Sequence, residues 1–373
     1  MSEPAASPTA TAAPPKYLRI QALRTLAAGM VVAYHVANRS YFVLGRTYAS
    51  NSLDFGNIGI DVFFVLSGFI IFSVHRVDIG HRSETWRYAS KRVVRIFPLY
   101  WIATALGLAV YATGYGDATK RDLSVILKSI VLFPQKDPAI FPIVNVGWTL
   151  TYELVFYAMF LLLIWWPRWP AILAWTAWLG SAAGVAVLRA TGVWHPPVTP
   201  LFTVLLSDRN LEFLIGCGVA WLVARRSLPS PRALMWAGLV VTLGLCLKLG
   251  IDSGFRPFNG DPVPLFALPI AAMVLGAAAL DRRGVGSPPS IVVRLGDASY
   301  ALYLVHFSLI TAAFELYKRI GPASYPALLV FGAATAAGVC VVALYVHEWV
   351  EAPLLRRLRK SVVPAEHPTR SES

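Results

Sequence analysis

The chain has 373 residues, of which 56% are apolar or aromatic and 14% are charged. Ordinary soluble domains carry about 25% charged residues, so this composition excludes a disordered chain and argues against a soluble enzyme. The net charge of +13 does not indicate a nucleic-acid-binding protein, because most basic residues fall in short connections between apolar runs, as in membrane proteins.

The order of apolar runs predicts an all-α integral membrane protein. Residues 1–16, rich in Pro, Ala, Ser and Thr, are expected to form a disordered N-terminal tail, and residues 361–373 a disordered C-terminal tail. Between them, residues 17–360 are expected to form one transmembrane domain, a bundle of about ten helices, since a bilayer core about 30 Å thick requires roughly 20 apolar residues per helix. The ten predicted spans lie at about 20–38, 57–75, 95–114, 147–166, 169–189, 209–225, 233–250, 264–281, 296–317 and 326–348.

The distribution of basic residues predicts that both termini are cytoplasmic. With this orientation the inner segments hold 20 lysines and arginines and the outer segments 11, as the positive-inside rule requires. The apolar segment 123–133 is only 11 residues long and contains Lys128. Treating it as a span would turn every later basic cluster outward, so it is expected to lie on the outer surface or as a re-entrant segment.

Ionisable residues within the predicted spans are the first candidates for function, because a charge at mid-bilayer costs roughly 3 kcal/mol. Arg24 and His35 are eleven positions apart in the first span, which places them on one helix face about 16 Å apart. Asp61, Glu153 and Glu212 all lie near the outer ends of their spans. A pair between His35 and Asp61 is therefore geometrically possible, and Asp61 or Glu153 is expected to orient the imidazole. Asp61 could also simply cap its helix.

The inner side is predicted to be cationic. Arg92 and Arg95 lie there together with Arg24, and guanidinium groups bind phosphates through paired hydrogen bonds. Between the two sides, Ser67 and Gly68 are expected to leave room for a slender chain. This polarity suggests transfer of a group through one continuous tunnel, from an anionic donor inside to an acceptor outside that a neutral imidazole activates.

Six motifs occur in order between about residues 17 and 360. They are LRTLAAGMVVAYH, GIDVFFVLSGFII, KRVVRIFPLYW, GWTLTYELVFY, LGDASYALYLVH and HEWVEAPLLRRLRK. On these motifs the chain resembles the membrane-bound acyltransferase 3 family, and within it most resembles the exopolysaccharide-production acetyltransferase branch.

The resemblance implies a ten-helix core, an acyl-CoA donor bound from the cytoplasm and acylation of a hydroxyl within or beyond the membrane. Arg24 and His35 match a pair regarded as essential in the family. Arg92 and Arg95 match the donor-binding pair, and Glu153 matches an acidic position in the fourth span.

The expected function is therefore O-acyl transfer, from acetyl-CoA or another acyl-CoA to a sugar hydroxyl of an extracytoplasmic polysaccharide or lipid-linked glycan precursor, in the bacterial inner membrane. The expected catalytic residues are His35, Asp61 and Glu153, and the expected donor-binding residues are Arg24, Arg92, Arg95 and Ser67. A direct attack and an acyl-histidine intermediate are equally compatible with these residues. The expected partners are the lipid bilayer, the glycan acceptor and polysaccharide-assembly proteins, with no nucleic acid and no metal.

Two other functions fit part of the pattern. A proton-coupled transporter or exporter would also bury Asp, Glu and His, but paired halves with broken spans are not visible in the sequence. A non-catalytic scaffold of polysaccharide assembly would not require His35.

Several other polar residues are interpreted as structural. Tyr303 and His306 could line the same cavity, but interhelical packing is favoured for them. His75 is expected in a solvated loop. The cluster of His347 with Glu348 and Glu351 is expected to be structural.

Overall fold

The computed structural model describes residues 17–46, 53–114, 117–135, 140–192, 199–253, 263–322 and 324–362, and every regular element in these ranges is helical. Both predicted tails, apart from residues 361 and 362, lie outside the described residues. The α-helices are α1 (Leu18–Leu44), α2 (Gly59–His75), α3 (Thr85–Ala112), α4 (Leu123–Ile130), α5 (Trp148–Trp165), α6 (Arg168–Ala190), α7 (Pro200–Leu205), α8 (Arg209–Arg225), α9 (Pro231–Ser253), α10 (Val263–Arg282), α11 (Ser290–Asp297), α12 (Ser299–Ile320), α13 (Tyr325–Val346) and α14 (Ala352–Val362).

The prediction of an all-α membrane protein is confirmed. Within the described ranges, nine helical segments are long and apolar enough to cross a bilayer. The remaining predicted span, 209–225, is helix α8, which has 17 residues. The last helical segment runs past the predicted end at residue 348, because a π-helical turn, His347–Glu351, joins α13 to α14 without a break.

The apolar segment 123–133 does not form a spanning helix, as expected. It contains α4, whose eight residues cover about 12 Å, less than half of a bilayer core. Leu123 and Leu127 of this helix are exposed on the surface of the protein.

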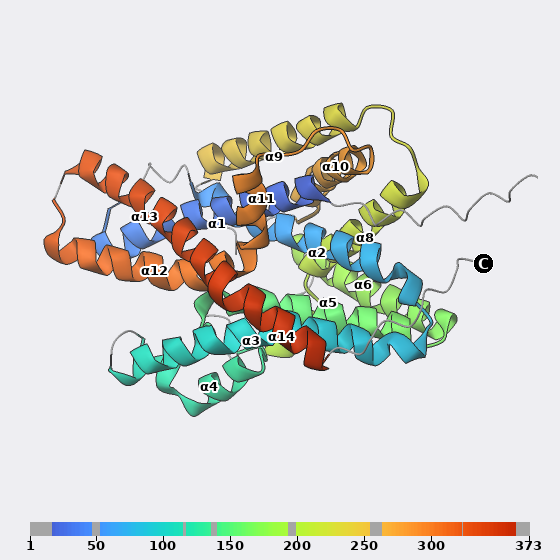
Figure 1. Ribbon diagram of the computed structural model, residues 1–373, viewed down its shortest axis with the longest axis horizontal. Coiled ribbons are helices and arrows are strands. Elements are labelled where there is room, and N and C mark those ends of the chain that lie inside the picture. Colours follow the sequence, from blue (N-terminus) through green and yellow to red (C-terminus); the bar gives the residue numbers. More distant parts are fainter. Residues whose placement is uncertain are drawn as a thin grey trace, which may run out of the picture.

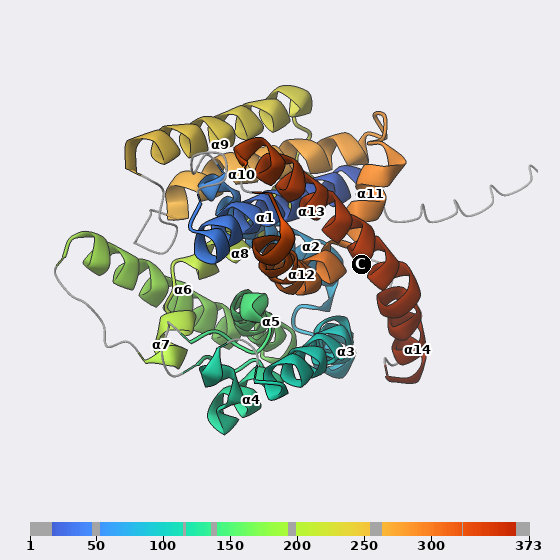
Figure 2. The same cartoon turned by 90° about the vertical axis from the view of Figure 1, so that its left-hand side faces the viewer.

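The helices form a bundle with α1 and α2 near its centre (Figure 1). Helices α9 and α10 lie together along one edge, and α3 and α4 lie along the opposite edge (Figure 2). Helix α14 crosses α3 on the outside of the bundle, where the two are in contact (Figure 1). The bundle therefore places the first span, the third span and the C-terminal helix around one region.

Two glycines bring α2 and α8 into close contact. A Cβ atom at Gly68 would overlap the backbone of Phe213, and one at Gly216 would overlap the carbonyl oxygen of Val65. Small residues permit such close approach between membrane helices, where van der Waals packing drives association. The expectation that Gly68 leaves a passage for substrate is therefore wrong, because the backbone of α8 fills that space.

Aromatic side chains fix α5 against its neighbours. Phe156 of α5 stacks on Phe213 of α8 with ring centroids 4.5 Å apart, and Phe160 stacks on Tyr88 of α3 at 5.6 Å. These rings are almost completely buried. They hold α3, α5 and α8 in the positions that form one side of the cavity described next.

Candidate active site

A cavity of about 550 Å³ lies between α1, α2, α3, α5 and α12, with the π-helical turn and α14 at its margin. This volume is within the range of roughly 300–1,000 Å³ found for sites that bind small molecules and cofactors. Its polar lining residues are Gln21, Arg24, Ser67, Arg92, Arg95, Thr149, Glu153, Tyr157, Asp297, Ser299, Tyr300, Tyr303, His347 and Arg359. Five of the seven residues predicted for the site, all except His35 and Asp61, therefore line one cavity.

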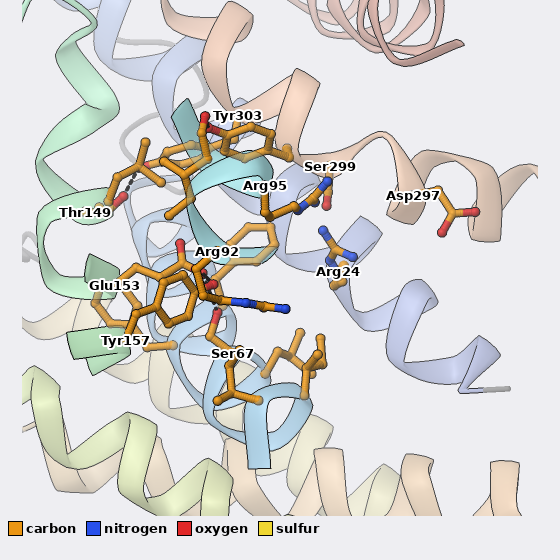
Figure 3. Close-up of a pocket in the computed structure, with 18 of the residues that line it drawn as sticks. Arg24, Ser67, Arg92, Arg95, Thr149, Glu153, Tyr157, Asp297, Ser299 and Tyr303 are labelled. Atoms are coloured by element: carbon orange, nitrogen blue, oxygen red, sulfur yellow. Dashed lines mark hydrogen bonds between the residues drawn. The ribbon is translucent and has the colours of Figure 1, made fainter. Parts of the chain in front are cut away.

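Arg92 and Arg95 project into the cavity from α3 (Figure 3). Residues three apart lie on the same face of a helix, so both side chains reach the same space. The Arg92 guanidinium lies over the rings of Tyr88 and Tyr157, 5.8 and 5.5 Å from their centroids. Its Nε atom is buried and has no hydrogen-bond partner among the described residues, so Arg92 has unused capacity to bind an anion.

Arg95 is held by the C-terminal segment. Its Nη1 donates to Glu351 Oε1 at 2.6 Å, and its guanidinium lies 5.0 Å from the centroid of the Tyr300 ring. The other carboxylate oxygen of Glu351 lies 2.8 Å from His347 Nδ1. Of the predicted cluster, His347 and Glu351 are in contact and position a cavity arginine, whereas Glu348 pairs with Arg294. His347 also lines the cavity.

Two more arginines complete the cationic side. Arg24 of α1 points toward the space that Arg92 and Arg95 face, and its Nη1 donates to Gln21 Oε1 at 3.1 Å (Figure 3). Arg359 of α14 also lines the cavity. The cavity lining thus carries four arginines against two carboxylates, Glu153 and Asp297, which favours an anionic ligand.

A carboxylate lies on the α5 side of the cavity. Glu153 Oε1 accepts a hydrogen bond from Ser67 Oγ at 3.3 Å and another from the Tyr157 hydroxyl. Tyr157 follows Glu153 by one helical turn, and Ser67 comes from α2 (Figure 3). The network joins α2 to α5 and fixes the orientation of the only predicted catalytic carboxylate that lines the cavity.

Tyr303 of α12 forms part of the cavity wall. Its hydroxyl donates to the carbonyl oxygen of Val146 at 2.8 Å and lies 2.5 Å from Thr149 Oγ1. The ring of Phe63 packs edge-on against it, with centroids 6.4 Å apart. Tyr303 is therefore held by both α2 and α5.

His35 lies behind this wall. The cavity lining includes Tyr303 but not His35, so the predicted tunnel from Arg24 does not reach His35 in this structure. The His35 ring contacts His306 and Phe307 of α12, with centroids 5.0 and 5.1 Å apart.

Asp61 does not have the partner predicted for it. Its Oδ1 accepts a hydrogen bond from Arg209 Nη1 at 2.7 Å, which joins α2 to α8 in an ion pair. The hypothesis of a His35–Asp61 pair is therefore wrong. Glu212, one turn after Arg209, is fully buried in the same interface between α2 and α8.

His75 is not the solvated loop residue that was expected. It is the last residue of α2 and only 1% exposed, and its Nδ1 lies 2.7 Å from Asp78 Oδ2. Asp78 also pairs with Arg87 at the start of α3. This group joins the ends of α2 and α3.

Two residues of the cavity lining, and one residue that positions a lining arginine, were not predicted for the site from the sequence. Arg359 was not among the residues predicted for the site, and packing was favoured for Tyr303, but both line the cavity. Glu351 was recognised only as part of a local cluster. A signal was available in the four-residue spacing of His347 and Glu351, but no local pattern identifies Arg95 as their partner.

Comparison with known proteins gives consistent results. Residues 17–347 match the family described as the acyltransferase domain. The chain is 32% identical over 319 residues to the exopolysaccharide production protein ExoZ of Rhizobium meliloti, covering 83% of this chain and 93% of ExoZ. It is 28% identical to the acyltransferase MdmB of Streptomyces mycarofaciens, over 96% of this chain and 98% of MdmB. It is also 24% identical to the peptidoglycan O-acetyltransferase OatA of Listeria monocytogenes, over 90% of this chain but 55% of OatA. No solved structure matches the chain.

Proposed function

Because this chain belongs to the acyltransferase 3 family, we propose that it is a membrane O-acyltransferase. It moves an acetyl or other short acyl group from cytoplasmic acyl-CoA. The acceptor is a sugar hydroxyl of an extracytoplasmic polysaccharide or lipid-linked glycan precursor. The observation that carries this proposal is the single cavity onto which Arg24, Arg92, Arg95 and Arg359 converge. Coenzyme A carries several phosphate charges on one end and a slender thioester arm on the other.

The arginines fit the phosphate end of such a donor. Guanidinium groups bind phosphate oxygens with paired hydrogen bonds, and the buried Nε of Arg92 has no partner in the part of the chain that the structure describes. The aromatic rings of Tyr88 and Tyr157 lie against the Arg92 guanidinium. The arm of the donor would then extend past Ser67 toward Tyr303.

The donor enters from the cytoplasm in this proposal. The arginine-rich side lies next to α14, which carries Arg356, Arg357 and Lys360 on its exposed surface. Basic segments remain on the cytoplasmic side of bacterial membranes, which supports cytoplasmic termini and an inner-membrane location.

The acceptor approaches from the opposite side, where His35 lies beyond Tyr303. His35 removes the proton from the acceptor hydroxyl while the hydroxyl oxygen attacks the thioester carbonyl. Asp61 supports the site indirectly, through the ion pair with Arg209 that joins α2 to α8. Glu153 holds the Ser67 and Tyr157 hydroxyls beside the donor arm.

The printed names of two relatives support the choice of acceptor. ExoZ is an exopolysaccharide production protein, and OatA is a peptidoglycan O-acetyltransferase. Both names refer to carbohydrate polymers outside the cytoplasm. We therefore propose a polysaccharide or its lipid-linked precursor as the acceptor, with polysaccharide-assembly proteins and the lipid bilayer as partners.

The proposal is tested by replacing His35 with Ala in cells that make this chain. Acyl groups released from the surface polysaccharide by mild alkali are quantified, together with the amount of protein in the membrane. His35→Ala should remove the acyl increment while the protein remains inserted at normal abundance. His81→Ala, at an exposed loop position, is the matched control and should keep full acylation.

Retention of acylation by His35→Ala would exclude this mechanism and favour a scaffold. A chain that exports glycan but adds no acyl group, and that does not bind acetyl-CoA when purified, would support the transporter alternative.

A further inference from the structure

A second histidine lies between His35 and the cavity. The ring of His306 is 5.0 Å from that of His35 and 5.7 Å from that of Tyr303, measured between centroids. Tyr303 lines the cavity, and both it and His306 belong to α12. The contacts therefore run in the order cavity, Tyr303, His306, His35.

The hydrogen bonding of His306 fixes which of its nitrogens can accept a proton. Nδ1 lies 3.0 Å from the carbonyl oxygen of Leu302, and a carbonyl oxygen only accepts, so Nδ1 carries the hydrogen. In a neutral imidazole the other nitrogen, Nε2, then presents a lone pair. His306 is 1% exposed, so this lone pair is shielded from water by the protein.

One nitrogen of each ring in this pair is not satisfied by the described residues. His306 Nε2 and His35 Nδ1 are both buried without a hydrogen-bond partner among the described residues. Leaving a buried polar atom unpaired costs energy, and native proteins leave few of them. Two such atoms on neighbouring rings favour a function in which they bind a hydroxyl or exchange a proton.

We infer that His306 shares with His35 the proton that leaves the acceptor hydroxyl, and that it returns this proton toward the donor cavity. The inference rests on the proposed function and extends it to a second residue. As the hydroxyl oxygen bonds to the acyl carbon, its proton passes to His35 and from His35 to Nε2 of His306. The carbon–sulfur bond breaks, and His306 gives the proton from Nε2 to the sulfur, which releases coenzyme A with a free thiol.

The test compares two substitutions of His306 that both prevent proton transfer at the Nε2 position, in different ways. His306→Asn keeps an N–H group near the position of Nδ1 but has no atom at Nε2. His306→Gln places an amide near Nε2, which can form a hydrogen bond but cannot carry a proton. If His306 transfers a proton, both variants should lower acyl transfer to surface polysaccharide by about 100-fold or more. Binding of acetyl-CoA to the purified protein should stay within about twofold of wild type.

His75→Asn is the matched control. His75 is equally buried, and its Nε2 also has no partner among the described residues. Its Nδ1 forms a hydrogen bond with Asp78, which the amide N–H of an Asn side chain can form instead. This variant should retain acyl transfer. Wild-type-like transfer in His306→Asn or His306→Gln would overturn the inference, because a structural or hydrogen-bonding role is restored by an amide.

A measurement on the wild type avoids any effect of substitution on folding. The rate of acyl transfer is followed as the fraction of heavy water is increased. If two protons move in the rate-determining step, the rate should fall along a curve as the fraction of heavy water increases. A straight-line decrease would indicate one moving proton and would overturn the two-histidine inference.

The outcomes separate the two proposals. If the wild type neither binds acetyl-CoA nor acylates glycan, the proposed function and this inference both fail. If His35→Ala is inactive while both His306 variants are active, only the present inference fails.

Discussion

Arg95 Nη1 lies 2.6 Å from Glu351 Oε1, which joins α3 to the π-helical turn between α13 and α14. Single π-helical turns occur frequently at functional sites, because the inserted residue shifts the face that the following helix presents. Here the turn positions Glu351 against a cavity arginine and is followed by the helix that brings Arg359 to the same cavity. The C-terminal segment therefore helps to form the cavity that we propose for the donor.

The Arg95–Glu351 pair should contribute to stability as a coupled unit. Glu351 is almost fully buried, so replacing either partner by Gln leaves a poorly solvated charge and should destabilise the protein. The double variant should lose less than the sum of the two single variants, by about 1–3 kcal/mol, because no unpaired charge remains. Denaturant unfolding in micelles of the wild type, both single variants and the double variant measures this coupling. Additive losses would contradict the pairing.

Arg359 should contribute to donor binding, unlike its neighbour. Arg359→Gln removes a positive charge from the cavity lining and should weaken acetyl-CoA binding about tenfold, equivalent to about 1.4 kcal/mol. The difference from wild type should shrink as salt concentration rises, because salt screens charge interactions. Lys360→Gln makes the same charge change on the adjacent residue, which does not line the cavity, and should bind normally. Equal losses in both variants would indicate a general effect of α14 charge.

Because α2 and α8 are in close contact, replacing two different glycines of α8 by Ala should have different effects on stability. A Cβ at Gly216 would overlap the Val65 carbonyl oxygen, whereas one at Gly218 meets no atom within 4 Å. Gly216→Ala should lower stability by about 1–3 kcal/mol, because the helices must move apart. Gly218→Ala should be neutral or slightly stabilising, since Ala favours the helix over Gly. Thermal unfolding of the purified proteins compares the two, and similar losses would argue against the close contact.

Lys120, which lies outside the membrane-spanning helices, should make the free energy of unfolding depend on pH. It is 3% exposed and its Nζ donates to the carbonyl oxygens of Phe141 and Pro142, both at 2.7 Å. Burial lowers its pKa to about 8, against an ordinary value of 10.5. Because the folded state releases its proton first, the unfolded state binds more protons between these values, and stability should rise as pH increases from about 8 to 10.5.

Lys120→Met removes this titration. The stability difference between wild type and Lys120→Met, measured by thermal unfolding at several pH values, should shift in favour of the wild type across that interval. A difference that is independent of pH would show that the Lys120 pKa is not lowered.

The sequence by itself predicted the nine helical segments of the described residues that are long and apolar enough to cross a membrane. A bilayer core offers no water to backbone groups, so each crossing must be a long apolar helix, and that requirement is visible in local composition. The same argument identified Arg24, Arg95 and Glu153, because a charge inside a span is unfavourable unless it faces the protein interior. Arg92 was identified from the cationic inner side. The structure brings all four to one cavity.

Only the tertiary structure decided which side chains meet. Asp61 pairs with Arg209 rather than His35, and His35 lies against His306 behind the Tyr303 wall. Arg359 reaches the cavity because a π-helical turn sets the direction of α14. Depth in the bilayer follows from position along a span, but rotation about each helix axis and the choice of neighbour depend on packing between surfaces that are almost equally apolar. That packing is set by close contacts such as the one at Gly216, which involve residues far apart in the chain.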